Sequence, residues 1–344
     1  MKKTISAAAL FAVLGAPAFA RTTNIENPLF MPKAGQGYGS VGVGLMYKQA
    51  DGSEAMADRG MAFAEEFPIW RGSGELGYGI TDNLTVRGRV GYTNNTSIDR
   101  SGLSEGRIGM NYRIFDGART DGWIWDIHAD AVLGGFSGLN ASVVPTPAGA
   151  PTRPIGFDFD NYSNGRWGAW LGTQVGRTWG KFTGAAFGEV QHTVGNRNSN
   201  ITIGNGVGGM FGQPTIDGES FSVLTGSTWE YHAGLRGFYE LSDRWAFGGG
   251  FAWRTRAANF LHSVDTYGLS PQAAGVVTAL APGLLGDMRD GMHEYIFSST
   301  VAYQMTDSMQ IAMYGEYTID SAEARSQNGT DIKFEMGFRL NVLF

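Results

Sequence analysis

Residues 330–344 read TDIKFEMGFRLNVLF. Apolar side chains occupy alternate positions from Ile332 to Val342, and charged or small side chains occupy the positions between them, from Asp331 to Asn341. A period of two is that of a β-strand, whose successive side chains point to opposite faces. The segment is therefore predicted to be a strand with one face toward an apolar medium and the other toward water.

This strand ends in Phe344. An alternating final strand with a terminal Phe resembles the last strand of bacterial outer-membrane β-barrel proteins. The resemblance implies an all-β fold, a transmembrane antiparallel up-and-down barrel, with lipid and lipopolysaccharide around it. It also implies that the barrel-insertion machinery recognises Phe344.

The beginning of the chain agrees with export. Lys2 and Lys3 precede a short apolar run from Ile5 to Leu14, and Ala18-Phe19-Ala20 has the small-x-small pattern of a cleavage site. This pattern predicts a secretory signal peptide over residues 1–20 and a bacterial outer-membrane location. Since no later run of about 20 apolar residues follows, a helical membrane protein is disfavoured.

Composition narrows the possible functions. The chain has 52 glycines and no cysteine among 344 residues, so disulfides, a lipoprotein anchor and thiol chemistry are excluded. Its net charge of −6 argues against a nucleic-acid partner. The mean hydropathy is slightly negative, as expected where only alternate strand residues face lipid.

The strands are expected in pairs joined by one kind of turn. Three turns begin with a hydroxyl residue followed by Asp, whose side chains bond the local backbone: Thr81-Asp82-Asn83, Ser242-Asp243-Arg244 and Thr306-Asp307-Ser308. Looser turns are expected at 116–122 and 178–181. Long loops are expected at the opposite end, over 49–68, 135–164, 195–227 and 258–293. The count is twelve strands over 38–344, with ten or fourteen as alternatives.

Residues 21–37 contain Asn27-Pro28-Leu29-Phe30 and show no usable period. We interpret them as a periplasmic N-terminal segment, for which a plain tether is favoured over a small plug in the barrel mouth.

Alternation assigns an outward, lipid-facing set of side chains. It comprises Val41, Val43, Leu45, Val86, Val90, Tyr92, Ile108, Met110, Tyr112, Leu235, Tyr239, Phe247, Phe251, Val301, Tyr303, Ile311 and Met313. Tryptophans near the strand ends should form interfacial girdles: Trp123, Trp125, Trp167, Trp179, Trp229, Trp245 and Trp253.

The complementary positions carry many charges, which predicts a wet lumen, because a charge facing lipid would cost several kcal/mol. The candidates for a constriction near mid-depth are Arg89, Arg107, Asp130, Glu189, Arg236, Glu316, Glu335 and Arg339. The candidates at the extracellular end are Arg254, Arg256, Glu230 and His232. This ring either filters small solutes by size and charge or forms an internal salt-bridge plug that closes the barrel.

The longest predicted loop contains an apolar stretch from Ser270 to Leu280. Ser270 as cap and Pro271 at the first helical position favour a short helix. Being apolar, it should pack against the lumen wall, another loop or a hydrophobic ligand, and one hypothesis is that it folds inward as a lid.

Other motifs are declined. Gly204, Gly206 and Gly209 lie in a polar loop without a strand-to-helix unit, and the five histidines are scattered, so neither a cofactor nor a metal site is expected. An outer-membrane lipid-modifying enzyme would need a serine beside an outward histidine such as His192, and the sequence shows no such pair. We therefore expect no enzymatic activity, and a structural barrel or adhesin stays open.

Two further stretches carry a second resemblance. Lys33-Ala34-Gly35-Gln36-Gly37, leading into the first strand, and Gly79-Ile80-Thr81-Asp82-Asn83-Leu84, at the first short turn, resemble outer-membrane channels associated with phenol-degradation pathways. That family implies uptake of small, often aromatic, compounds. The functional prediction from the sequence is a porin-like channel for passive diffusion or uptake of small solutes, of unknown oligomeric state.

Overall fold

A computed structural model describes residues 24–49, 69–95, 100–117, 122–134, 167–194, 198–202, 212–216, 218–256, 261–286, 292–320 and 332–344. The signal peptide predicted over residues 1–20 and most of the long loops lie outside these ranges. None of the helices in the described ranges combines the length and the hydropathy needed to cross a bilayer.

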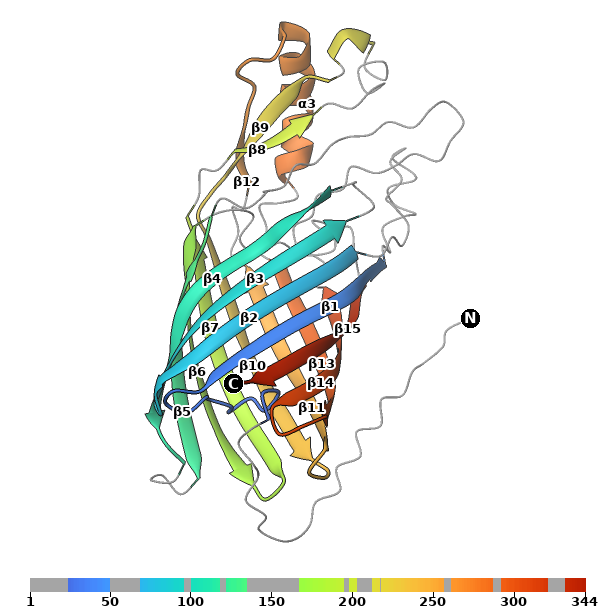
Figure 1. Ribbon diagram of the computed structural model, residues 1–344. Coiled ribbons are helices and arrows are strands. Elements are labelled where there is room, and N and C mark those ends of the chain that lie inside the picture. Colours follow the sequence, from blue (N-terminus) through green and yellow to red (C-terminus); the bar gives the residue numbers. More distant parts are fainter. Residues whose placement is uncertain are drawn as a thin grey trace.

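Twelve antiparallel strands form a closed barrel (Figure 1). They are β1 (Gly37–Gln49), β2 (Ile69–Thr81), β3 (Leu84–Asn95), β4 (Arg100–Phe115), β5 (Trp123–Val132), β6 (Gly168–Trp179), β7 (Phe182–Thr193), β10 (Thr228–Glu240), β11 (Trp245–Arg256), β13 (Met292–Gln304), β14 (Met309–Asp320) and β15 (Ile332–Leu343). Each pairs with its neighbour in chain order, and β15 pairs with β1. The predicted fold class and the count of twelve are confirmed.

The first and last strands close the sheet, and the terminal Phe takes part. Gly37 and Phe344 exchange two backbone hydrogen bonds, of 2.7 and 2.9 Å. A Cβ on Gly37 would collide with the Phe344 ring, so the ring lies directly against the glycine backbone. Closure leaves no open edge, which is the condition for placing a sheet in hydrocarbon.

The three predicted turns have the expected chemistry. The hydroxyl oxygens of Thr81, Ser242 and Thr306 accept hydrogen bonds from backbone N–H groups two residues later, at 3.2, 3.3 and 3.3 Å. The same end of the barrel carries the start of β1 and the end of β15, and we call it the short-turn end.

The outer surface is an apolar band. Of the predicted outward set, Val41 and Ile108 are 68% and 61% exposed, and most others are also exposed, whereas Leu45, Val301 and Tyr303 are half-buried. Exposed tryptophans lie at both ends: Trp123, Trp179 and Trp245 at the short-turn end, and Trp70, Trp167 and Trp229 at the other. This is the girdle arrangement of transmembrane barrels.

Buried apolar residues occur at both ends of the barrel, with Met46, Ile69 and Val132 toward the long loops and a cluster near the short turns. Phe238, Ala246, Ala302 and Ala312 form one buried cluster on β10, β11, β13 and β14. Most other buried interior side chains are polar or charged, so ion pairs and hydrogen bonds hold the interior together.

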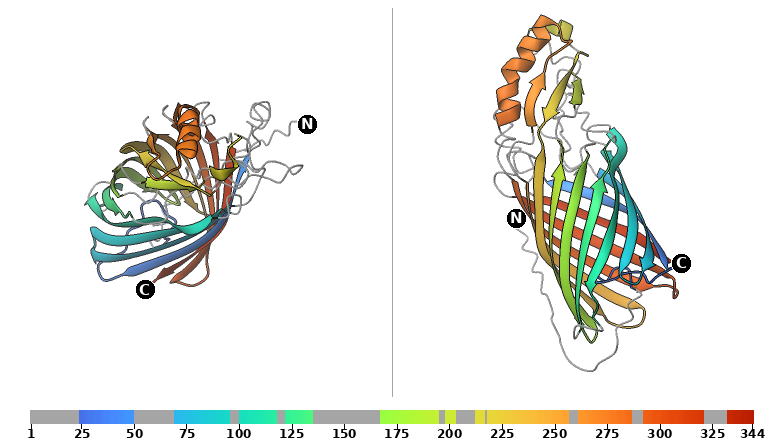
Figure 2. Two further views of the ribbon diagram at one scale, coloured as in Figure 1. Left: turned by 90° about the horizontal axis from the view of Figure 1, so that it is seen from above. Right: turned by 90° about the vertical axis from the view of Figure 1, so that its left-hand side faces the viewer.

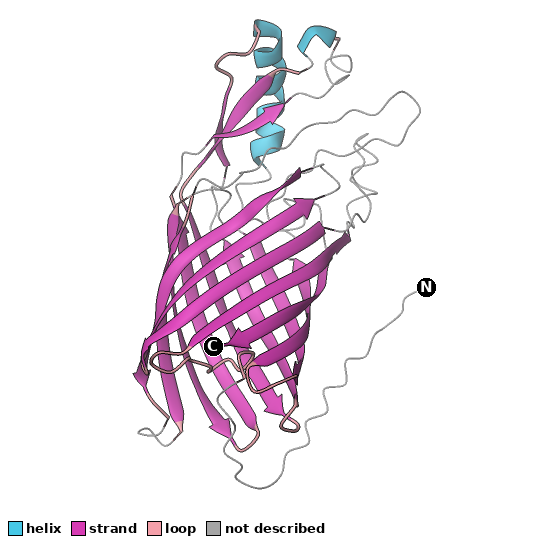
Figure 3. Cartoon of the chain, viewed as in Figure 1, coloured by secondary structure: helices cyan, strands magenta, loops and turns pink. Residues whose placement is uncertain are grey.

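A second sheet, not predicted from the sequence, stands beyond the barrel strands (Figure 2, right). It contains β8 (Asn198–Thr202), β9 (Ser220–Thr225) and β12 (Leu261–Asp265), with the short 3-10 helix η1 (Pro214–Ile216) in the connection before β9. The helix α3 (Pro271–Gly286) packs beside β12, and all helical structure of the described chain belongs to this projection (Figure 3).

The predicted helix is confirmed, and its cap has the expected form. The Ser270 Oγ accepts a hydrogen bond from the Ala273 N–H at 3.2 Å and donates one to Glu219 at 2.6 Å. Ala273 and Val277 are buried against the small sheet rather than in the barrel. The hypothesis of an inward-folding lid is therefore wrong for α3, because its apolar face is satisfied within the projection.

Candidate functional site

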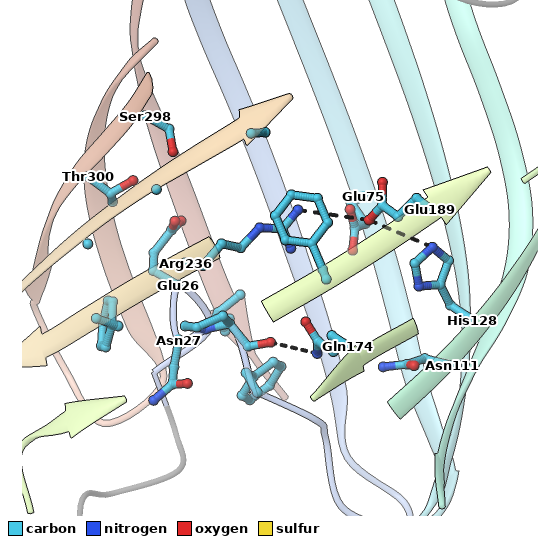
Figure 4. Close-up of a pocket in the computed structure, with 18 of the residues that line it drawn as sticks. Glu26, Asn27, Glu75, Asn111, His128, Gln174, Glu189, Arg236, Ser298 and Thr300 are labelled. Carbon is cyan, nitrogen blue, oxygen red and sulfur yellow. Dashed lines mark hydrogen bonds and ion pairs between the residues drawn. The ribbon is translucent and has the colours of Figure 1, made fainter. Parts of the chain in front are cut away.

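The barrel encloses a cavity of about 620 Å³ that extends from mid-depth to the short-turn end (Figure 4). Charged and polar side chains from β2 to β7 form one side of it, and glycines, serine and threonine of β11 and β13 form another. The lumen is thus asymmetric: one wall carries large charged side chains, and the other carries small side chains or none.

Two ion pairs tie the wall of β3, β4 and β5. Arg87 donates two hydrogen bonds to the carboxylate of Asp130, at 2.7 and 3.1 Å. Arg113 donates two to the carboxylate of Asp126, at 2.8 and 3.0 Å. Such bidentate ion pairs are geometrically specific and satisfy both partners. These arginines therefore hold the strands of the barrel wall together.

A third group lies on β11, β13 and β15, toward the long-loop end. Glu294, 1% exposed, accepts hydrogen bonds from Arg254 and from the ammonium of Lys333. Nearer mid-depth, Glu335 accepts from Arg71 at 3.0 Å and from the Tyr314 hydroxyl at 3.1 Å. Buried carboxylates without such partners would be strongly destabilising.

The pairing around Glu189 on β7 is much looser. His128 Nε2 and Arg236 Nη2 each lie 3.9 Å from its Oε1 atom (Figure 4). His232 Nδ1 lies 4.0 Å from its Oε2 atom. These separations exceed hydrogen-bonding distance. One carboxylate therefore faces three basic groups without being firmly bound by any of them.

A stack of Arg107, Trp170 and His232 lies next to the Glu189 carboxylate. The Arg107 guanidinium lies 3.4 Å from the ring centroid of Trp170, and the Trp170 ring meets His232 edge-on at 5.3 Å. Arg89 is the direct cross-strand partner of Arg107. Stacking on the indole face offers one of these adjacent cations a favourable partner.

The segment before β1 enters the short-turn end of the lumen (Figure 1, dark blue). The Glu26 carboxylate accepts two hydrogen bonds from Arg339, both of 3.1 Å, and one from Asn341 at 2.8 Å. The Asn27 amide donates to the Thr183 hydroxyl at 3.2 Å on the other side of the barrel.

Backbone carbonyls of the same segment are bound as well. The Pro28 carbonyl accepts from Gln174 at 2.8 Å, and the Leu29 carbonyl accepts from Arg113 at 2.8 Å. Leu29 itself is buried. The structure therefore differs from the plain tether favoured by the sequence, because residues 24–31 are held by lumen side chains that were expected to face water.

Most predicted constriction residues do face one cavity. Those that line it are Arg89, Arg107, Asp130, Glu189, Arg236, Glu316 and Arg339, together with His232 from the predicted extracellular-end set. Arg339 lies at the N-terminal segment rather than in a mid-depth ring. Glu335, Arg254 and Glu230 are held within the wall, and the Arg256 side chain lies outside the described part.

Sequence reasoning missed Glu26, Asn27 and Trp170 as site residues. Trp170 occupies an inward position of β6, which alternation from Trp179 would have given. No periodic signal marks Glu26 or Asn27, because their segment is not a strand.

No protein-family model matches the sequence, and no curated protein matches it. Solved structures match in fold. The COG4313 outer membrane channel from Pseudomonas putida F1 aligns with a TM-score of 0.52 at 13% identity, covering 91% of this chain and 97% of that chain. The NanC porin gives 0.42 at 11% identity, covering 88% and 98%, and the CymD monoaromatic hydrocarbon channel gives 0.42 at 9%, covering 90% and 88%. At these identities the likeness shows the fold, that of outer-membrane β-barrels.

Proposed function

We propose that this chain is an outer-membrane channel that lets small solutes diffuse through a charged lumen. The observation that carries the proposal is the cavity of about 620 Å³ inside a closed barrel, lined by Arg, Glu, His, Ser and Thr. Sieving by lumen width and by charged side chains requires neither a nucleophile nor a cofactor.

The apolar outer band and its tryptophan girdles support placement in a bilayer, with lipid and lipopolysaccharide as neighbours. The short-turn end then faces the periplasm and the projection with α3 faces outward. The closing contact between Gly37 and Phe344 supports a role for Phe344 in assembly by the insertion machinery. The likeness to the COG4313 channel supports a channel role for this fold.

Residues 24–31 narrow the periplasmic mouth in this arrangement, so conduction requires that the segment move or leave a path beside it. The contacts of Glu26 and Asn27 favour a second candidate, a barrel plugged by its own N-terminal segment. Both candidates make clear predictions for the same recordings.

The test is single-channel recording of the purified full-length protein in planar bilayers in KCl, beside a variant lacking residues 24–32. Discrete conductance steps in the full-length protein are the expected result, and they should be larger in the deletion variant. Silence of the full-length protein with steps in the deletion variant would establish the plugged barrel. Silence of both folded proteins would refute the channel.

A further inference from the structure

Pairs of polar side chains meet over glycines at several places in this lumen. Gly109 of β4 pairs with Arg87 on one neighbouring strand and with Asp130 on the other, and those two side chains hydrogen-bond above it. A Cβ on Gly109 would collide with Asp130. The missing side chain of Gly109 therefore leaves the space in which Arg87 and Asp130, on the two neighbouring strands, form their ion pair. We call a glycine in such a position a floor.

Gly172 of β6 has the same position between His128 and Glu189. A Cβ there would collide with the His128 ring and crowd the Glu189 side chain. The same row of three residues thus recurs across adjacent strands of this wall. It consists of a charged residue, a floor glycine and a residue whose side chain complements the charge.

Gly250 of β11 is the floor glycine of a third such row, but the side chains on its two neighbouring strands do not meet above it. It pairs with Arg236 on β10 and with Ser298 on β13, and a Cβ on Gly250 would lie 2.8 Å from the Ser298 Oγ and 3.6 Å from the Arg236 Cγ. The guanidinium has turned away from the serine and lies 4.0 Å over the ring of Phe187. The floor of Gly250 stays open to the cavity.

Arg236 is also held differently from Arg87. Its side chain is 45% exposed, its one ion contact is at 3.9 Å, and its guanidinium makes no hydrogen bond with the residues that the structure describes. The Phe187 ring covers a face of the guanidinium and leaves the in-plane N–H donors directed outward from the stack. Those donors are available to a solute.

Arg236 and Ser298 lie on the two strands that flank Gly250, so a carboxylate placed over the glycine lies between their side chains, and Arg236 reaches it by turning back from Phe187. Glu316 follows Ser298 in the row and also lines the cavity, so a second negative charge on the solute would be repelled.

We propose that Arg236, Gly250 and Ser298 form a binding subsite for the carboxylate of small monocarboxylate solutes in transit. The guanidinium supplies paired N–H donors, the Ser298 hydroxyl supplies a third donor, and the glycine supplies the space. This inference rests on the proposed channel function and names the chemical class of its solute.

The experiment measures single-channel conductance against the concentration of potassium propionate, with potassium succinate as the dianion. Conductance should saturate with propionate, and the half-saturation concentration should rise about tenfold in Arg236→Gln, the equivalent of losing one charge-assisted hydrogen bond. Gly250→Ala keeps every charge but fills the floor, and the same loss is expected. Arg244→Gln removes one positive charge at a short turn outside the lumen and should leave saturation unchanged. Heat-modifiable migration on gels verifies that each variant is folded.

Propionate line broadening in NMR spectra of the detergent-solubilised full-length protein gives a binding readout that does not depend on conduction. Broadening by the wild type that Arg236→Gln abolishes, with propionamide unaffected, is the expected result. Conductance in KCl with the same propionate saturation in wild type and in Arg236→Gln would overturn the subsite and leave the channel standing. Absence of conductance in every folded variant would instead overturn the channel, and the NMR comparison would still decide the subsite.

Discussion

Replacing Glu26 by Ala should open the short-turn end of the barrel. This side chain holds the N-terminal segment to the β15 wall through two hydrogen bonds from Arg339 and one from Asn341. The Asn341 side chain is fully buried, so its amide loses a partner that water does not readily replace. The substitution changes the segment and leaves every barrel strand intact.

The magnitude follows from these contacts. Hydrogen bonds to charged groups contribute about 1.5–3 kcal/mol each in protected sites. Arg339 remains 35% exposed and regains water when Glu26 is lost, so its pair must be discounted. A net loss of about 2 kcal/mol shifts the ratio of displaced to seated segment about 30-fold toward the displaced state.

The assay is the fraction of time that single channels spend in their highest conductance level. Glu26→Gln keeps the shape and part of the hydrogen bonding, so its effect should lie between wild type and Glu26→Ala. The cysteine-free sequence permits a locked control, Asn27→Cys with Thr183→Cys, because these side chains meet at 3.2 Å. A short bis-methanethiosulfonate reagent, which joins each cysteine through a disulfide and releases sulfinate, should hold the low-conductance state until a reductant cleaves the disulfides.

Equal open fractions in wild type, Glu26→Ala and the cross-linked protein would refute the reasoning. That result would mean that ions pass beside the seated segment and that its contacts do not limit conduction.

Three further outcomes are expected. Glu316→Gln removes a cavity-facing carboxylate, so the chloride-to-potassium permeability ratio from reversal potentials should rise about sevenfold, because one charge at about 7 Å in water changes the energy of each ion by about 0.6 kcal/mol in opposite senses; a fall would contradict the assigned lumen position. Deleting residues 270–286 should leave single-channel conductance unchanged, because α3 packs beside β12 outside the barrel. Phe344→Ala should lower the heat-modifiable folded fraction, since the ring covers Gly37 where the sheet closes; an unchanged fraction would show that the backbone pairing suffices.

The alternation of apolar and polar residues located the strands well, because one face of each strand belongs to the apolar outer surface and the other faces the polar interior. The strand from Met309 to Asp320 has the predicted limits, and the hydroxyl turns formed as expected. The small sheet of β8, β9 and β12 was missed because its strands have five or six residues. So short a segment gives too few alternations to stand out within a loop.

The inward charges were predictable but their partners were not. Arg113 and Asp126 are direct cross-strand neighbours, so a correct register would have paired them. Arg87 and Asp130 lie two strands apart and meet over Gly109, a contact that depends on the absence of a side chain between them. Glu26 reaches Arg339 from a segment without periodicity, and no local pattern encodes a contact between residues so far apart in the chain.

The many glycines of this chain acquire a specific meaning in the lumen. Where side chains meet over a glycine, as at Gly109 and Gly172, they fill the lumen, and at Gly109 their ion pair also ties the wall. Gly250 lines the cavity with only the small Ser298 hydroxyl close against it, and Gly248, two residues nearer the short turns, pairs with the small Thr300. An open strip therefore follows β11 and β13 past Arg236 toward the Phe238 cluster and the N-terminal segment. A solute on this path meets the exposed Arg236 before it meets the segment, so Arg236 should govern which solutes enter while Glu26 governs how often they leave.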